Sequence, residues 1–82
     1  MNRLSNKEIL RVHTNIEGTP VSIINEIRAE RVIRIYDKWH SHEGNDDKAE
    51  RCYFKIRTNK GLICDIYREE MTKDWHIEKK YE

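Results

Sequence analysis

The chain has little of what stabilises or specialises many small proteins: 82 residues include two cysteines, one proline and three glycines. Two cysteines are too few for the disulfide framework of a small secreted domain. No uninterrupted apolar run approaches the roughly 18 residues of a membrane-spanning helix, and residues 1–8 lack the apolar core of a secretory signal. We therefore expect a cytoplasmic protein that does not associate with membranes.

Neither sign of charge dominates, because the chain has 16 Lys and Arg and 15 Asp and Glu, which give a formal net charge of +1. No global field then draws the protein to nucleic acid, and an electrostatic partner must recognise a local patch. The isolated glycines form no phosphate-cradling loop, and no serine sits in a glycine elbow. We expect no enzymatic activity and no cofactor.

The length allows one small domain with a thin core. Period-two patterning predicts strands over residues 9–15, from Val21 onward, over 31–39, within the hairpin 52–67 and over 75–81. The predicted fold is all-β, a small, partly open antiparallel barrel or strongly bent sheet of five to six strands. Residues 40–50 are almost entirely polar and predict a flexible loop within this single domain, 1–82.

Two parts of this prediction have alternatives. In the segment 31–39, Ile33, Ile35 and Trp39 alternate with polar residues, which favours a strand. Ala29, Val32, Ile33, Tyr36 and Trp39 also fall at helical spacing. Residues 21–30 are left open between strand, helix and loop.

The stretch from Cys52 to Tyr67 has the most specific pattern in the chain. A three-residue loop at residues 59–61, with Gly61 in the left-handed conformation, sets Ile56 opposite Cys64 and Phe54 opposite Ile66. A two-residue turn would mix apolar and polar residues on both faces, which is penalised when one face is buried. The longer loop is therefore predicted.

In that register Cys52 and Cys64 are offset by roughly 13 Å along the strands, too far apart for a disulfide. We expect both to be buried, free thiols. The tryptophans, Trp39 and Trp75, lie in phase with apolar residues and are expected in the core rather than at an exposed interface. The predicted core comprises Ile33, Ile35, Phe54, Ile56, Leu62, Cys64, Ile66, Trp75 and Ile77.

Several anchors along the chain form a recognisable series: Gly18-x-Pro20, Val32-x-x-Ile35-x-Asp37-x-Trp39, Tyr53-Phe54-x-Ile56-x-Thr58 with Gly61, Asp65-Ile66-Tyr67-Arg68 and Trp75-x-Ile77-x-x-x-Tyr81. In this series the chain resembles a prokaryotic family of small proteins of unknown function, some members of which are encoded near Y-family translesion DNA polymerases. The resemblance covers roughly residues 9–82 and implies an all-β domain, with no activity to carry over. Residues 23–29 depart from the family pattern, which has an aromatic residue and a glycine turn there.

The hairpin face opposite the apolar residues is basic and aromatic. Tyrosines offer stacking platforms and Lys or Arg neutralise phosphates, a combination that single-strand binders use. The family context likewise implies single-stranded nucleic acid or a DNA-repair protein as partner. In the competing interpretation, Lys55 pairs with Asp65 across the strands and the face is ordinary solvated surface. The candidate binding residues are Arg34, Tyr36, Lys38, Tyr53, Lys55, Arg57 and Tyr67.

Two further interpretations come from other classes. The face could instead serve a protein partner, since exposed sheet edges are sites of association. A metal-dependent enzyme would use His40 and His42, with Glu43, Asp46 and Asp47 nearby. That spacing is not a strong metal signature, and a flexible polar loop explains it better, so no metal site is predicted.

Overall fold

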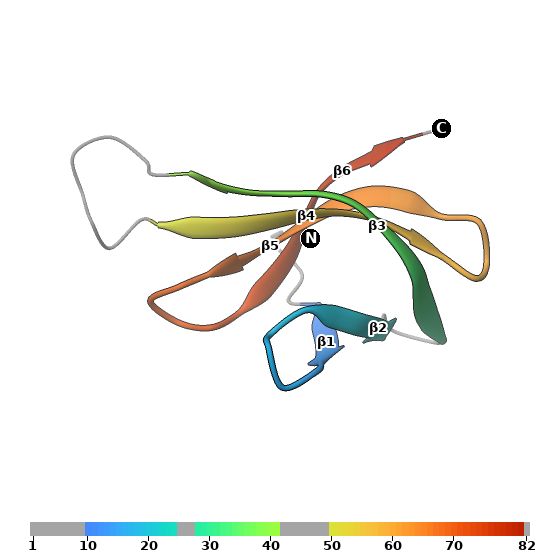
Figure 1. Cartoon of the computed structure of the whole chain (residues 1–82), viewed down its shortest axis with the longest axis horizontal. Helices are drawn as coiled ribbons and strands as arrows, with labels where there is room; N and C mark the ends of the chain where they lie inside the picture. Colours follow the sequence, from blue (N-terminus) through green and yellow to red (C-terminus); the bar gives the residue numbers. More distant parts are fainter. Residues whose placement is uncertain (1–9, 25–27, 42–49, 82) are drawn as a thin grey trace, which may run out of the picture.

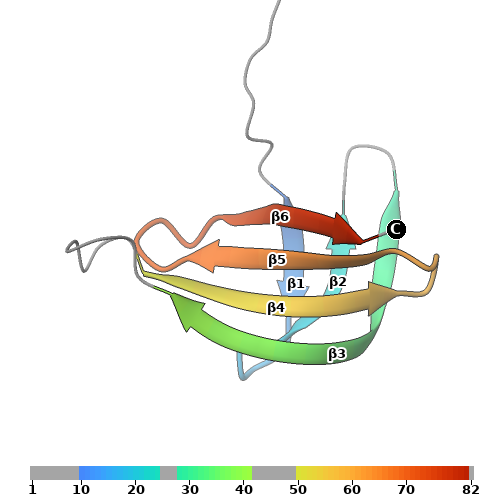
Figure 2. The ribbon, with the colours of Figure 1, turned by 90° about the horizontal axis from the view of Figure 1, so that it is seen from above.

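A computed structural model describes residues 10–24, 28–41 and 50–81. These residues form six antiparallel strands in chain order across one sheet, which curls into a half-barrel. Figures 1 and 2 show β3 to β6 side by side, with β1 and β2 crossing beneath them. The all-β prediction is confirmed. The strands are β1 (Arg11–Thr14), β2 (Pro20–Ile24), β3 (Ala29–Ser41), β4 (Arg51–Thr58), β5 (Ile63–Glu69) and β6 (Trp75–Tyr81).

The β4–β5 hairpin has the predicted register. Gly61 has a φ of +90°, and the amide of Thr58 donates to the carbonyl of Leu62 at 2.9 Å, which closes the three-residue loop. Ile56 lies opposite Cys64 and Phe54 opposite Ile66, as expected. A left-handed glycine at the third loop position matches the right-handed twist of the strands, so local turn chemistry is enough to set this register.

Strand β3 is long because it belongs to both layers of the fold. Ala29–Arg31 pair with β2 and Val32–Ser41 pair with β4. Two register shifts interrupt the second pairing, with Ile33 and Tyr36 as the extra residues. Bulges bend a strand and increase its twist, and the first follows directly on the change of partner from β2 to β4. Figure 2 shows β3 bending from one layer into the other.

The bulges and the open edge of β3 correct three core predictions. Ile33 is the extra residue of a bulge and is 55% exposed, while Ile35 lies on a strand edge and is 37% exposed. Because Tyr36 is an extra residue, the side chains after it in β3 point to the face opposite to the one that simple alternation predicts. Trp39 therefore lies opposite Tyr53 on the outer face, away from β1 and β2, instead of in the core.

The core fills the space between the two layers. From β4 to β6 it contains the predicted Phe54, Ile56, Cys64, Ile66 and Trp75, with Leu62 and Ile77 partly buried against it. Leu10 and Ile23 cover it from below, although neither was among the predicted core residues. The amide of Leu10 also donates to the carbonyl of Trp75 at 2.9 Å, so one backbone bond links the β1 end of the sheet to β6.

Two polar contacts hold the bend of β3 against the hairpin. The buried hydroxyl of Thr58 donates to the carboxylate of Glu30 at 2.6 Å. The amide of Asn59 donates to the carbonyl of Arg31, and the Asn59 side-chain oxygen accepts from the amide of Arg31, both at 2.9 Å. Because a buried carboxylate without a donor is costly, the Thr58 contact stabilises this placement of β3.

The remaining local predictions have mixed outcomes. The helical alternative for 29–39 is wrong, since those residues are in β3. In the segment left open, Pro20–Ile24 and Ala29–Glu30 are strand, while 25–27 lie outside the described residues. Of the expected loop at 40–50, His40 and Ser41 belong to β3 instead, and 42–49 are likewise outside the described residues. Among the described residues no helix is long and apolar enough to cross a membrane.

Both cysteines are buried and free, as predicted. Burial raises the pKa of the Cys64 thiol to about 11, and burial also raises the pKa of Cys52. Both thiols are therefore neutral near pH 7 and poor nucleophiles, which fits a packing role.

The left-handed conformation at Gly61 provides a direct test of the hairpin. A Cβ added there would meet no atom within 4 Å, so Gly61→Ala has a purely conformational cost. We expect the free energy of unfolding to fall by about 1–2 kcal/mol, measured by urea denaturation. Gly61→Asn should cost less, because asparagine tolerates this conformation. Lys60→Ala is the neighbouring control, and an equal effect of Lys60→Ala and Gly61→Ala would contradict the assignment.

Candidate functional site

The outer face of β3 to β6 carries a row of four aromatic side chains, one from each strand. Trp39 stacks on Tyr53 with ring centroids 5.2 Å apart and an interplanar angle of 3°. Tyr67 follows at 5.2 Å from Tyr53, and His76 at 5.2 Å from Tyr67. The register sets these residues opposite one another, so the sheet itself brings the rings into contact.

This aromatic row is largely closed to solvent. Tyr53 is 8% exposed and Tyr67 is 5% exposed. The guanidinium of Arg51 lies 4.7 Å from the ring centroid of Tyr67 and 3.9 Å from the carboxylate of Glu69. Burial raises the pKa of Tyr67. The sequence places these tyrosines on the correct face, but they stabilise the sheet and leave little ring for a ligand to stack on.

Next to the aromatic row, Lys55 and Asp65 lie opposite each other as predicted. No ion pair joins them in the described part of the chain. Asp65 instead accepts a hydrogen bond from the Tyr81 hydroxyl at 2.8 Å, and the Lys55 ammonium lies 4.3 Å from the centroid of the Tyr81 ring. The hydrogen bond to Asp65 raises the pKa of Tyr81, because it favours the neutral phenol.

Further cationic side chains lie on the same face. Arg34 and Arg57 are directly opposite each other on β3 and β4. The guanidinium of Arg34 lies 5.3 Å from the centroid of the Tyr36 ring, and the ammonium of Lys55 lies 5.9 Å from it. On the far side of Lys55, the Lys79 ammonium lies 4.9 Å from the Tyr81 ring. We call this group the basic cluster: Arg34, Tyr36, Lys55, Arg57, Lys79 and Tyr81.

The structure thus brings four of the seven predicted site residues together in the basic cluster. Lys38 lies elsewhere, because the Tyr36 bulge turns it to the inner side, where its ammonium lies 5.5 Å from the Phe54 ring. The prediction missed Lys79 and Tyr81. A register shift leaves Glu78 unpaired in β6 and sets Tyr81 opposite Ile63 on the outer face. Simple alternation with Trp75 and Ile77 would place Tyr81 on the inner face instead.

The histidines do not converge in the part of the chain that is described. His40 is exposed on β3, and His76 lies at the end of the aromatic row, with its Nε2 3.6 Å from Glu69. Within residues 10–24, 28–41 and 50–81, no three His, Cys, Asp or Glu side chains form a group that could hold a metal ion. The other proposed ligands, His42, Glu43, Asp46 and Asp47, lie outside the described residues.

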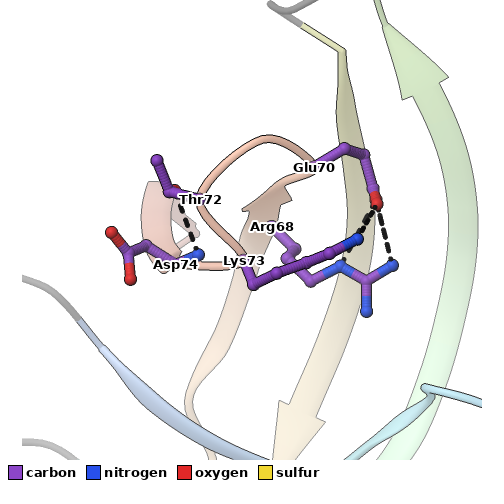
Figure 3. Close-up of polar contacts among 5 residues, drawn as sticks. All are labelled: Arg68, Glu70, Thr72, Lys73 and Asp74. Carbon is purple, nitrogen blue, oxygen red and sulfur yellow. Dashed lines mark hydrogen bonds and ion pairs between the residues drawn. The ribbon is translucent and has the colours of Figure 1, made fainter.

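A separate polar group stabilises the turn between β5 and β6 (Figure 3). Arg68 donates to the carboxylate of Glu70 at 3.0 Å, and the ammonium of Lys73 donates to it at 3.2 Å. Lys73 has a φ of 66°. Although burial opposes ionisation of Glu70, these hydrogen bonds hold its pKa below the ordinary 4.5. The group is structural, since it joins the end of β5 to the turn that follows it.

Comparison with known proteins found no relative of this chain. No family model, curated protein or solved structure matches the chain. The resemblance to the family of unknown function therefore stays a prediction.

The pKa of Glu70 predicts an acid-dependent contribution to stability. A carboxyl group with a lowered folded-state pKa stabilises the fold fully above its unfolded pKa, near 4.5, and less as the pH falls through the folded pKa. Glu70→Gln should therefore lower the free energy of unfolding by about 0.5–1 kcal/mol at pH 7, and much less at pH 3. Thermal denaturation at both pH values measures this difference. Glu78→Gln, an exposed change, should have little effect at either pH; a loss that Glu70→Gln shows equally at both would be contrary to this account.

Proposed function

We propose that the protein is a non-catalytic binding module whose basic cluster binds the phosphate backbone of single-stranded nucleic acid. The observation that supports this most directly is the Arg34–Arg57 pair. Like charges directly opposite each other on neighbouring strands destabilise a sheet. A bound phosphate between two guanidinium groups would turn that repulsion into charge-assisted hydrogen bonding.

The surroundings of the pair favour an anionic ligand. Lys55 and Lys79 add two ammonium groups on the same face. Of the carboxylates there, Asp65 is buried and already accepts from Tyr81, and Asp37, opposite Lys55, makes no ion pair among the described residues. Within the described structure neither Arg57 nor Arg34 makes an ion pair, and the guanidinium of Arg34 lies near the Tyr36 ring. The cations are therefore available to phosphates, and a local patch of this kind is what a chain with near-neutral net charge would need.

The geometry also indicates what kind of binding to expect. Tyr36 is 42% exposed and offers ring surface to a base, whereas Tyr53 and Tyr67 are closed within the aromatic row. The ligand would be held mainly through its backbone, with about one base stacked. Such binding is weak, depends little on sequence and is strongly sensitive to salt.

We expect labelled oligothymidine to bind with a Kd of about 10–100 μM at low salt, near the range of non-specific binding. With three or four phosphates neutralised, the logarithm of the association constant should fall with a slope of about −2 to −3 against the logarithm of salt concentration. Fluorescence anisotropy measures both quantities. The variant Lys55→Glu/Arg57→Glu should lose at least about tenfold in affinity and flatten the slope.

The matched control is Arg11→Glu/Arg31→Glu, which changes net charge equally but alters exposed residues of β1 and of the β2-paired end of β3. It should bind nearly as well as the original protein, and circular dichroism should show that both variants are folded. Absence of binding by the unaltered protein at about 100 μM, or equal loss in both variants, would refute the proposal.

A further inference from the structure

One edge of β3 has no strand beside it in the described structure. Val32–Ser41 pair with β4 on one side, while β2 pairs only with Ala29–Arg31. Figure 2 shows this part of β3 as the rim of the layer, with β4 on its inner side. Unpaired backbone amides and carbonyls along such an edge can accept a further strand.

This edge exposes three large apolar side chains among its charged ones. Ile33, Ile35 and Tyr36 are all exposed large hydrophobic residues and lie within four consecutive positions. By contrast, β6 at the other end of the layer carries Glu78, Lys79 and Lys80, which are exposed. Charged side chains discourage edge pairing and apolar ones favour it. The two edge strands of the layer, β3 and β6, therefore differ in how readily they can pair with a further strand.

Charge then indicates what kind of strand fits. Arg34 and Asp37 both lie on the outer face, opposite Arg57 and Lys55, and they flank Ile35 and Tyr36. The segment Arg-Ile-Tyr-Asp carries opposite charges at its two ends, so in an antiparallel pair of two copies arginine meets aspartate at each end on the outer face. A two-fold dimer requires this self-complementarity, because the same patch is used by both subunits.

We propose that the β3 edge is a self-association site, at which a second copy of the chain pairs antiparallel about a two-fold axis between Ile35 and Tyr36. Arg34 of each copy then lies opposite Asp37 of the other. Asp37 Oδ1 accepts from the Lys38 amide at 2.8 Å, and Oδ2 has no partner in the described structure. That oxygen can accept from the guanidinium of the second copy.

The contact is expected to be short and weak. The bulges at Ile33 and Tyr36 twist the edge and limit how far a regular ladder can extend. Pairing over about four residues buries less area than a standard stable interface. We therefore expect a dimer that dissociates at low concentration, with a Kd of about 10–100 μM.

Charge reversal followed by mixing tests the pairing. Sedimentation equilibrium, without nucleic acid, should show concentration-dependent dimers of the unaltered protein. Arg34→Asp places aspartate opposite aspartate twice, and Asp37→Arg places arginine opposite arginine twice, so each variant alone should associate at least about tenfold more weakly. An equimolar mixture of the two variants restores both opposite-charge pairs, and its dimers should return.

The matched control is Arg11→Asp, which should dimerise as the unaltered protein does, and circular dichroism should show every variant to be folded. A protein that stays monomeric at about 1 mM, single variants that still dimerise normally, or a mixture that does not recover would each overturn the proposal. Lys55→Glu/Arg57→Glu should retain the dimer, so loss of nucleic-acid binding and loss of self-association are measured separately.

Discussion

The bend of β3 is the constraint on which most of this structure depends. Because two extra residues are inserted between Val32 and Asp37, one strand serves both layers, and β1 and β2 can cover the apolar face of the hairpin. The same insertions move Trp39 to the outer face and Lys38 to the inner one. They also place Ile33 and Tyr36 in solvent. The core, the aromatic row and the exposed edge are thus consequences of one local departure from regular pairing.

A chain of this size has a thin core, and contacts at the ends of the sheet and at the bend of β3 add stability. The Leu10–Trp75 backbone bond links the two ends of the sheet, and Thr58 and Asn59 tie the hairpin to the bend of β3. On the outer face the aromatic row acts as a second, smaller apolar group, which buries ring surface on a side that no other layer covers among the described residues. Packing on both faces of β4 and β5 explains why the hairpin is the best-buried part of the sheet.

The outer face therefore has a packed part and an accessible part, which residue types alone do not distinguish. Tyr53 and Tyr67 contribute to stability, because their rings are occupied by neighbouring rings. Tyr36 and the cations around it remain accessible, because they lie where a bulge opens the sheet. Placing Arg34 opposite Arg57 costs stability, and such a cost at an accessible site is the reason for proposing a binding function there and not along the aromatic row.

By itself the sequence determined most of the strand content, the hairpin register and the division of β4 and β5 into an apolar and a polar face. Those features follow from alternation and from a glycine that sets its own turn, both of which are local. Only the tertiary structure decided the positions of Ile33, Tyr36 and Glu78 as extra residues, because a bulge is defined by the strand opposite. Consequently the spacing of residues in the sequence could not predict that Ile35 is exposed or that Lys38 and Trp39 lie on the faces opposite to those expected. Nor could it predict that Tyr81 lies beside Lys55. Each depends on contacts between residues distant in the chain.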